Sequence, residues 1–126
     1  MAVSNHLITA FTKELLNTDI NIIPRFLALD VYALSYIFDN DEDFSLVTTI
    51  ILNSLHKIKA GEVDGEDLIY ALSNWKSYHF QSTLSNILGE EDLRAVYKKI
   101  DTSLNVLGFG HRYIPSDFYE RIKSRI

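Results

Sequence analysis

Residues 22–38, IIPRFLALDVYALSYIF, form the most apolar stretch of the 126-residue chain. Pro24 favours a helix start, because its missing N–H would have no partner in the first turn of a helix anyway. On such a helix the apolar side chains cover nearly every side, and a narrow strip around Asp30 and Ser35 is left for water. We therefore predict a buried central helix at about residues 24–38.

The composition argues against a membrane or secreted protein. The apolar stretch is shorter than the roughly 20 residues that a membrane span needs, and it contains Arg25 and Asp30. The N-terminus lacks the basic region and apolar core of a secretory signal. Cysteine is absent, which excludes disulfides and thiolate chemistry and fits a reducing compartment. We expect a cytoplasmic protein without a membrane segment.

Amphipathic patterns predict helices on both sides of the central one. Residues 4–17 carry a stripe at Leu7, Phe11 and Leu15, with Ser4 before it as a helix cap. After the acidic run at 39–43, apolar residues recur from Phe44 to Ile58, and Gly61 gives a helix end. These segments predict the first and third helices.

The second half of the chain is also interpreted as helical. Asp64 is the expected cap of a helix with Leu68, Leu72, Trp75 and His79 on one face, and we expect a break near Gln81 before Gly89. From Glu90 to Leu107, apolar residues recur every three or four positions. Residues 108–110, Gly-Phe-Gly, are predicted to be a turn, followed by a short helix with Phe118 and Ile122 inward. No segment alternates with period two, so we predict one all-α domain over residues 1–126, a bundle of six or seven helices.

The charge is distributed unevenly along the chain. The net charge is −5, with −8 in residues 1–97 and +3 in residues 98–126. Nucleic-acid binding draws most of its affinity from Lys and Arg that neutralise phosphates. The acidic body therefore predicts a cationic protein partner and no nucleic acid.

Acidic residues gather at 39–43, 62–67 and 90–92, each before a predicted helix. Carboxylates at helix N-termini stabilise the helix, which is one interpretation of all three groups. The other is an acidic partner surface, formed if interhelical turns meet at one end of the bundle. The candidate partner-binding residues are Asp39, Asp41, Glu42, Asp43, Glu62, Asp64, Glu66 and Asp67.

No motif predicts a metal, a cofactor or a catalytic centre. Asp39, Asp41 and Asp43 have the spacing that opens a calcium loop, but Phe44 and Ile50 occupy the positions of its glycine and glutamate. The four histidines show no ligand spacing. Residues 108–112, GFGHR, resemble a segment of bacterial citrate synthases, a match of five residues that we interpret as coincidence. The same turn presents His111, Arg112 and Tyr113, which leaves a small-ligand or catalytic domain as one alternative.

In its size, its acidity, its lack of cysteine and its lack of a catalytic motif, the chain resembles the small acidic immunity proteins that bacteria pair with secreted toxins. These include helical proteins that neutralise the nuclease toxins of contact-dependent growth inhibition systems. The resemblance implies an inhibitor, not an enzyme, whose acidic face covers the basic cleft of a toxin domain. A regulatory or adaptor protein that binds through an apolar groove or the basic tail is the other alternative.

Overall fold

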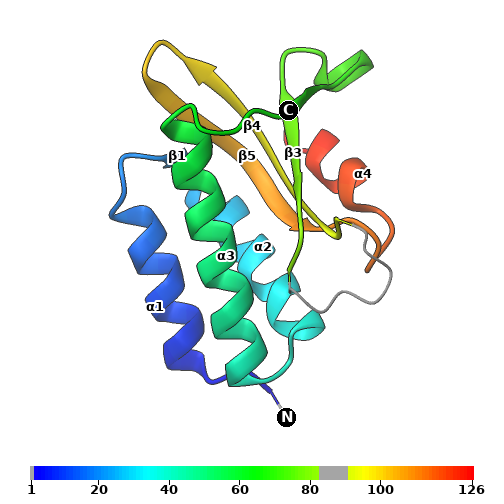
Figure 1. Ribbon diagram of the computed structural model, residues 1–126. Coiled ribbons are helices and arrows are strands. Elements are labelled where there is room, and N and C mark those ends of the chain that lie inside the picture. The colour runs from blue at the N-terminus through cyan, green and yellow to red at the C-terminus, as the bar shows by residue number, and fades with distance from the viewer. Residues whose placement is uncertain (1, 83–90) are drawn as a thin grey trace.

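The computed structural model describes residues 2–82 and 91–126, which form a mixed α/β fold, so the predicted all-α bundle is wrong. A five-stranded sheet has the order β1-β5-β4-β3-β2 (Figure 1). The two-residue β1 (Asn21–Ile22) pairs in parallel with β5 (Ser103–His111). The strands β4 (Leu93–Ile100), β3 (Lys76–Phe80) and β2 (Glu66–Asp67) follow, all in antiparallel pairs.

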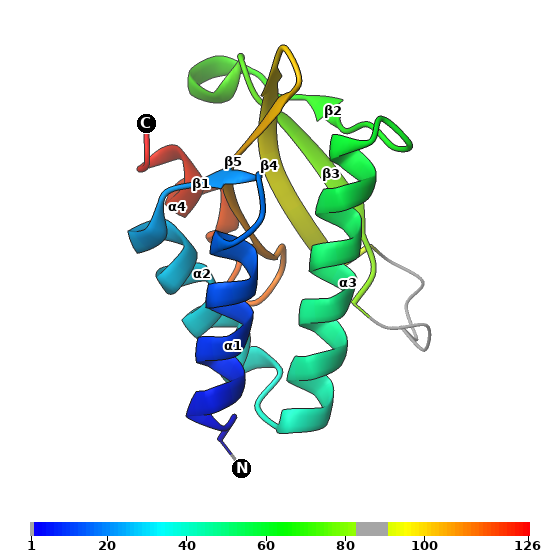
Figure 2. The same ribbon diagram turned by 90° about the vertical axis from the view of Figure 1, so that its left-hand side faces the viewer.

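Four of the predicted helices are confirmed. They are α1 (Asn5–Leu16), α2 (Pro24–Ile37), α3 (Asp41–Lys59) and the short α4 (Phe118–Lys123). Pro24 opens α2 in its first turn, and Gly61 follows the end of α3 with a positive φ of 76°, as its sequence position predicts. The helices α1 and α3 lie side by side, whereas α4 lies apart from both (Figures 1 and 2).

The segment predicted as a helix from Glu90 to Leu107 is, where it is described, most of a β-hairpin. Residues on both faces of β4 are buried, with Leu93, Ala95 and Tyr97 in one core cluster and Val96 in the other. A strand covered on both faces does not alternate between apolar and polar residues. The apolar residues of the two faces, taken together along the sequence, therefore recur every three or four positions as they would in a helix. The hairpin turns after Ile100, which pairs with Ser103.

The helix predicted to start at Asp64 is also wrong. Its residues form β2, a short 3₁₀ helix (Tyr70–Leu72) and β3. The residues of β3 pair with β4, Ser77 opposite Val96 and His79 opposite Arg94, and this pairing outweighs the weak helical pattern. The break predicted near Gln81 falls just after β3, while the expected end at Gly89 lies outside the described residues.

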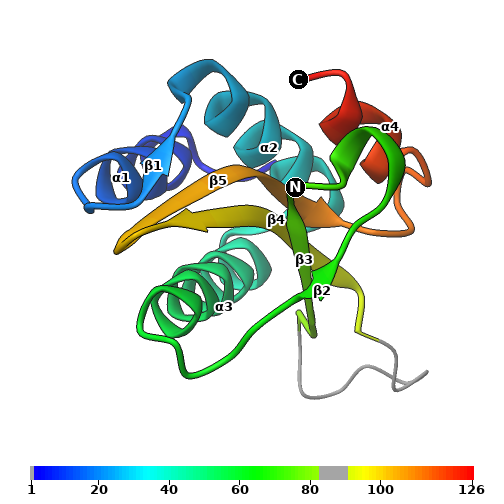
Figure 3. The same ribbon diagram turned by 90° about the horizontal axis from the view of Figure 1, so that it is seen from above.

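Two apolar clusters fill the two faces of the sheet. The larger joins α1, α2 and α3 to the sheet, and its fully buried members include Leu15, Leu27, Leu34, Ile51 and Leu55. The smaller lies under α4 and consists of Leu72, Val96, Leu107, Phe118 and Ile122. Seen from above, α2 lies along β5, and α4 lies beyond the end of α2 (Figure 3). The short α4 leaves the rest of its sheet face to other side chains.

The central helix is not buried nearly all round, and the side that it exposes is not the one predicted. Asp30, expected at the solvent strip, is fully buried. Leu29, Tyr32 and Tyr36, expected to be largely covered, are instead 59, 57 and 80% exposed. The helix is therefore amphipathic, with a carboxylate on its inner face.

Asp30 forms a bidentate ion pair with Arg125 near the C-terminus. The two hydrogen bonds measure 2.8 Å from Nη1 to Oδ2 and 2.6 Å from Nη2 to Oδ1. The Phe109 N–H donates to Oδ2 at 3.1 Å, and Arg125 also donates to the Leu107 carbonyl at 3.2 Å. Burial raises the pKa of Asp30, and the hydrogen bonds from Arg125 and Phe109 act in the opposite direction. The pair connects α2, β5 and the C-terminal segment.

The glycines predicted as a turn lie within β5, so that prediction is also wrong. A Cβ on Gly108 would lie 2.4 Å from Arg125 Nη1, 2.4 Å from Ile122 Cδ1 and 2.9 Å from Asp30 Oδ2. Glycine is required here for close approach, not for a positive φ. The bare backbone of Gly108 makes room for the ion pair.

Replacing one partner of the pair tests its role. Asp30→Leu or Arg125→Met alone leaves a buried charge without its partner, and each is expected to lower the free energy of unfolding by about 3–5 kcal/mol. The double variant Asp30→Leu/Arg125→Met leaves no such charge and should lose much less. Urea unfolding measures all three. Additive losses in the double variant would contradict the pairing.

Candidate functional site

The predicted acidic residues fall into two groups at opposite ends of α3. The helix spans 19 residues, about 28 Å at 1.5 Å per residue. Asp39, Asp41, Glu42 and Asp43 lie at its N-terminal end, and Glu62, Asp64, Glu66 and Asp67 follow its C-terminal end. The structure therefore does not bring the two groups together into one surface.

Two carboxylates of the first group hold the start of α3 in place. Asp41 accepts hydrogen bonds from the Ser4 N–H at 2.8 Å and the Ser4 hydroxyl at 2.7 Å, which lower its pKa. Asn40 caps the helix by accepting from the Asp43 N–H at 2.9 Å, and its amide donates to the Asp43 carboxylate at 2.8 Å. Asp39 and Glu42 are exposed. Asp41 thus fixes α1 to α3.

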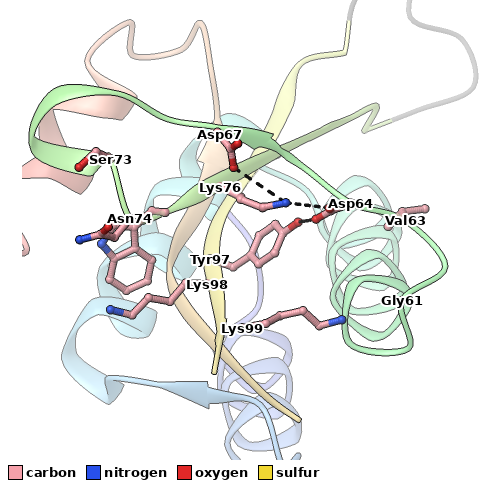
Figure 4. A pocket seen from close by; sticks show the side chains of 11 residues that line it. Gly61, Val63, Asp64, Asp67, Ser73, Asn74, Lys76, Tyr97, Lys98 and Lys99 are labelled. Atoms are coloured by element: carbon pink, nitrogen blue, oxygen red, sulfur yellow. Dashed lines mark hydrogen bonds and ion pairs between the residues drawn. The ribbon is translucent and has the colours of Figure 1, made fainter. Parts of the chain in front are cut away.

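Asp64 and Asp67 of the second group line a pocket of about 370 Å³ at the end of the sheet (Figure 4). Asp64 accepts hydrogen bonds from Lys76 Nζ at 2.8 Å, the Tyr97 hydroxyl at 2.7 Å and the Gly65 N–H at 3.0 Å. The bonds from Lys76 and Tyr97 are the main reason that the pKa of Asp64 is lowered to about 2. Burial raises the pKa of Tyr97. Asp64 therefore fastens the loop after α3 to the sheet.

The other side chains of this pocket carry both signs of charge. Asp67 lies 3.9 Å from Lys76, and the Lys98 ammonium lies 4.6 Å from the centre of the Trp75 ring. Lys99 also lines the pocket (Figure 4). The pocket is thus not the uniformly acidic surface expected from the sequence.

Asp92, Ser82 and His111 form a buried polar cluster where the sheet meets the 111–114 turn. Asp92 accepts from the Ser82 N–H at 2.8 Å and the Ser82 hydroxyl at 2.5 Å, and His111 Nε2 lies 3.4 Å from its carboxylate. Burial alone would raise the pKa of Asp92, but the hydrogen bonds from His111 and Ser82 outweigh it and lower the value to about 2.

These three residue types also make up hydrolase triads, but their connections here are different. In a triad the serine hydroxyl donates to histidine, whereas Ser82 donates to Asp92. His111 Nδ1 accepts the N–H groups of Tyr113 and Ile114 at 3.1 and 3.0 Å. The imidazole therefore has no free acceptor for a nucleophile. His111, predicted in a presenting loop, is the buried last residue of β5 and positions the turn after it.

A second polar group, the arginine site, lies on the sheet face that α4 covers only in part. We define it as His79, Arg94, Arg112, Tyr113 and Tyr119. His79 pairs with Arg94 across β3 and β4, and Arg94 pairs with Gly110 across β4 and β5. Because Gly110 has no side chain, the strand position opposite Arg94 leaves space beside the Arg94 side chain. Only Arg112 and Tyr113 of this site were singled out from the sequence, because the strand pairing was not recognised.

Arg94 is a buried cation. The residue is only 7% exposed. Its Nη1 donates to the backbone carbonyls of Glu91 and of Leu93, the latter at 3.0 Å. Its Nε is buried and has no hydrogen-bond partner. Within residues 2–82 and 91–126, no carboxylate lies within 4.0 Å of the Arg94 or Arg112 guanidinium. In the described part of the chain, the hydrogen bonds of the Arg94 guanidinium thus go to backbone carbonyls.

Aromatic rings hold the two guanidinium groups. Arg94 lies 6.0 Å and Arg112 5.8 Å from the centre of the Tyr113 ring, and Arg112 lies 5.1 Å from that of Tyr119. The Tyr119 hydroxyl shares a 2.9 Å hydrogen bond with Ser77. Tyr113 is 46% exposed. Rings orient the arginines without neutralising them.

The positive potential of this site is also felt by His79. Burial is the main cause that lowers its pKa below 6.5, and the charges of Arg94 and Arg112 act in the same direction, against Glu66 and Glu91. His79 is therefore neutral at pH 7.

Neither a metal cluster nor a membrane span is found in the described part of the chain. No three His, Asp or Glu side chains there are placed to hold a metal ion. No described helix is both long and apolar enough to cross a membrane. Comparisons with protein-family models, curated proteins and solved structures give no match.

Acid titration tests the Asp92 cluster. Because the folded pKa of Asp92 is about 2 and its ordinary value is 3.8, its stabilising effect is complete above about pH 4 and is lost as the pH falls towards 2. Asp92→Asn should reduce the free energy of unfolding at pH 7 by about 1–2 kcal/mol and flatten its decline in acid. Asp39→Asn, at an exposed position, is the control. An unchanged acid profile for Asp92→Asn would contradict this assignment.

Proposed function

We propose that the protein binds single-stranded nucleic acid through phosphate contacts at the arginine site. The observation that carries this proposal is the buried Arg94 guanidinium, which has an unpaired Nε and no carboxylate partner among the described residues. A buried charge is costly unless a counter-ion compensates it. A phosphate bound by Arg112, which is less buried than Arg94, supplies that counter-ion nearby, and its oxygens match the hydrogen-bond geometry of guanidinium groups.

The neighbouring rings favour a nucleotide over a simple anion. The centre of the Tyr113 ring lies 6.0 Å from the Arg94 and 5.8 Å from the Arg112 guanidinium, and this residue is 46% exposed, so a flat ligand can reach it. Bases of single strands stack on such rings, and arginines beside them contact the phosphates. This combination supports a ligand that carries both a phosphate and a base.

This proposal replaces the expectation that the acidic charge excludes nucleic acid. Net charge governs long-range attraction, whereas a short site depends on the few cations that touch phosphates. Two arginines neutralise about two phosphates, so the affinity should depend only modestly on salt, with a logarithmic slope of about −1.4. A long duplex track is not expected.

Fluorescence anisotropy with labelled single-stranded RNA and DNA oligonucleotides tests this function. Arg112→Gln, which alters a side chain that is not fully buried, should weaken binding about tenfold or more, because a charge-assisted phosphate contact is lost. It should also reduce the salt slope by about 0.7.

Lys13→Gln, at an exposed position on α1, is the matched control and should bind like the unaltered protein. Absence of binding at low salt, or equal binding by Arg112→Gln and Lys13→Gln, would refute the proposal.

The second candidate is the immunity-type inhibitor of a basic toxin domain, in the cytoplasm. It is supported by exposed carboxylates in the segment after α3, at Glu62 and in β2 at Glu66 and Asp67. Because the two acidic groups lie at opposite ends of α3, the partner would contact this segment and not both groups. Its acidic charge would then match a cationic cleft. The lack of cysteine fits this location.

Growth rescue separates the two candidates. If the reading frame directly upstream encodes a secreted protein, the chain is co-expressed with the C-terminal domain of that protein. An inhibitor should restore growth, and Glu62→Gln/Glu66→Gln/Asp67→Asn should restore it less, because the cationic partner loses its attraction. Asp39→Asn/Glu42→Gln, at the other end of α3, is the control. If expression of this chain without the upstream domain arrests growth, that result would count against this candidate.

A further inference from the structure

The outer face of α2 carries an uncharged stripe. Ala28, Leu29, Tyr32 and Tyr36 are all exposed, and Tyr32 lies within three or four residues of each of the others, so they share one face of the helix. Tyr36 is 80% exposed. Such a run of exposed apolar and aromatic side chains is typical of a binding surface.

Charges stand only at the two ends of this stripe. Arg25 is exposed in the first turn of α2, and Asp39 is exposed just after the helix ends at Ile37. Asp30, the one other charged residue of α2, points inward to Arg125. A shallow groove of about 380 Å³ continues the stripe towards α1 and is lined by Ala2, Val3, Ile8, Tyr32, Tyr36 and Asp39, among others.

We infer that this stripe is covered by a second copy of the chain, with the two α2 helices packed antiparallel about a two-fold axis. In such an interface each contact between two residues occurs twice. If Tyr32 lies on the axis, Arg25 in the first turn of α2 lies opposite the C-terminal end of the partner's α2, where Asp39 follows the helix and lines the groove beside Tyr36. By the same symmetry Ala28 faces the partner's Tyr36.

Both correspondences favour a copy of the same chain over a different partner. The ends of the stripe carry opposite charges, so the antiparallel arrangement pairs them and a parallel arrangement would oppose like charges. The large Tyr36 meets the small Ala28, as interdigitated helices require. The stripe is therefore complementary to itself.

The inferred interface does not use the arginine site. The arginine site lies on the sheet face that carries α4, whereas the side chains of the stripe are exposed on the outer side of α2. Figure 2 shows α2 on the left of the molecule, below α4 and behind α1. The dimer is therefore independent of the proposed function. Since the stripe spans a 14-residue helix, about 21 Å long, we expect a dimer that dissociates at micromolar concentrations.

Sedimentation velocity of the full chain over a wide concentration range tests this inference. The unaltered protein should form dimers as concentration rises. Tyr32→Glu should remain monomeric, because it places two like charges together at the axis. Arg25→Glu and Asp39→Arg should each weaken the dimer at least tenfold, because each opposes like charges across the interface.

The double variant Arg25→Glu/Asp39→Arg restores opposite charges at both ends and should recover most of the lost association. Lys57→Glu, at an exposed position on α3, controls for net charge, and circular dichroism confirms that each variant is folded. A protein that stays monomeric at several hundred micromolar, a dimer insensitive to Tyr32→Glu, or a double variant as weak as the single ones would overturn the inference.

Discussion

The buried ion pair between Asp30 and Arg125 is the constraint on which the arrangement of the fold depends. The edge strand β1 pairs with β5 only at Asn105 and Val106, so the Phe109 N–H farther along needs another acceptor. Asp30 supplies it at 3.1 Å. One carboxylate therefore completes the strand edge, orients α2 and holds the C-terminal segment.

The pair also limits the local sequence. Any side chain on Gly108 would enter the space of the guanidinium and of Ile122. Arg125, which follows α4, can reach Asp30 on α2 only because β5 has no side chain at Gly108. Close packing between layers thus explains the glycine at position 108. Glycine is also common in turns, so the sequence alone does not distinguish the two roles.

The same layering explains where the candidate site lies. The larger core cluster joins α1, α2 and α3 to the sheet, but the six-residue α4 is too short to cover the face that carries the smaller cluster. Polar and aromatic side chains of β3, β4 and the turn after β5 occupy the remaining area. There Arg94 is buried against carbonyls and near Tyr113. By contrast, Asp41 and Asp64, which were expected on a partner surface, hold loops and helix ends through hydrogen bonds.

The sequence by itself determined the helices near residues 4–17, 24–38 and 44–58 and the last short helix, because caps and apolar spacing act within one or two turns. It did not determine the sheet, since β4 is buried on both faces and its pairing partners are set by the register with β3 and β5. Nor did it determine the inward direction of Asp30, whose partner is 95 positions away. The arginine site was hidden for the same reason. Its residues come from two neighbouring strands, from the turn after β5 and from α4, and only tertiary packing places them side by side.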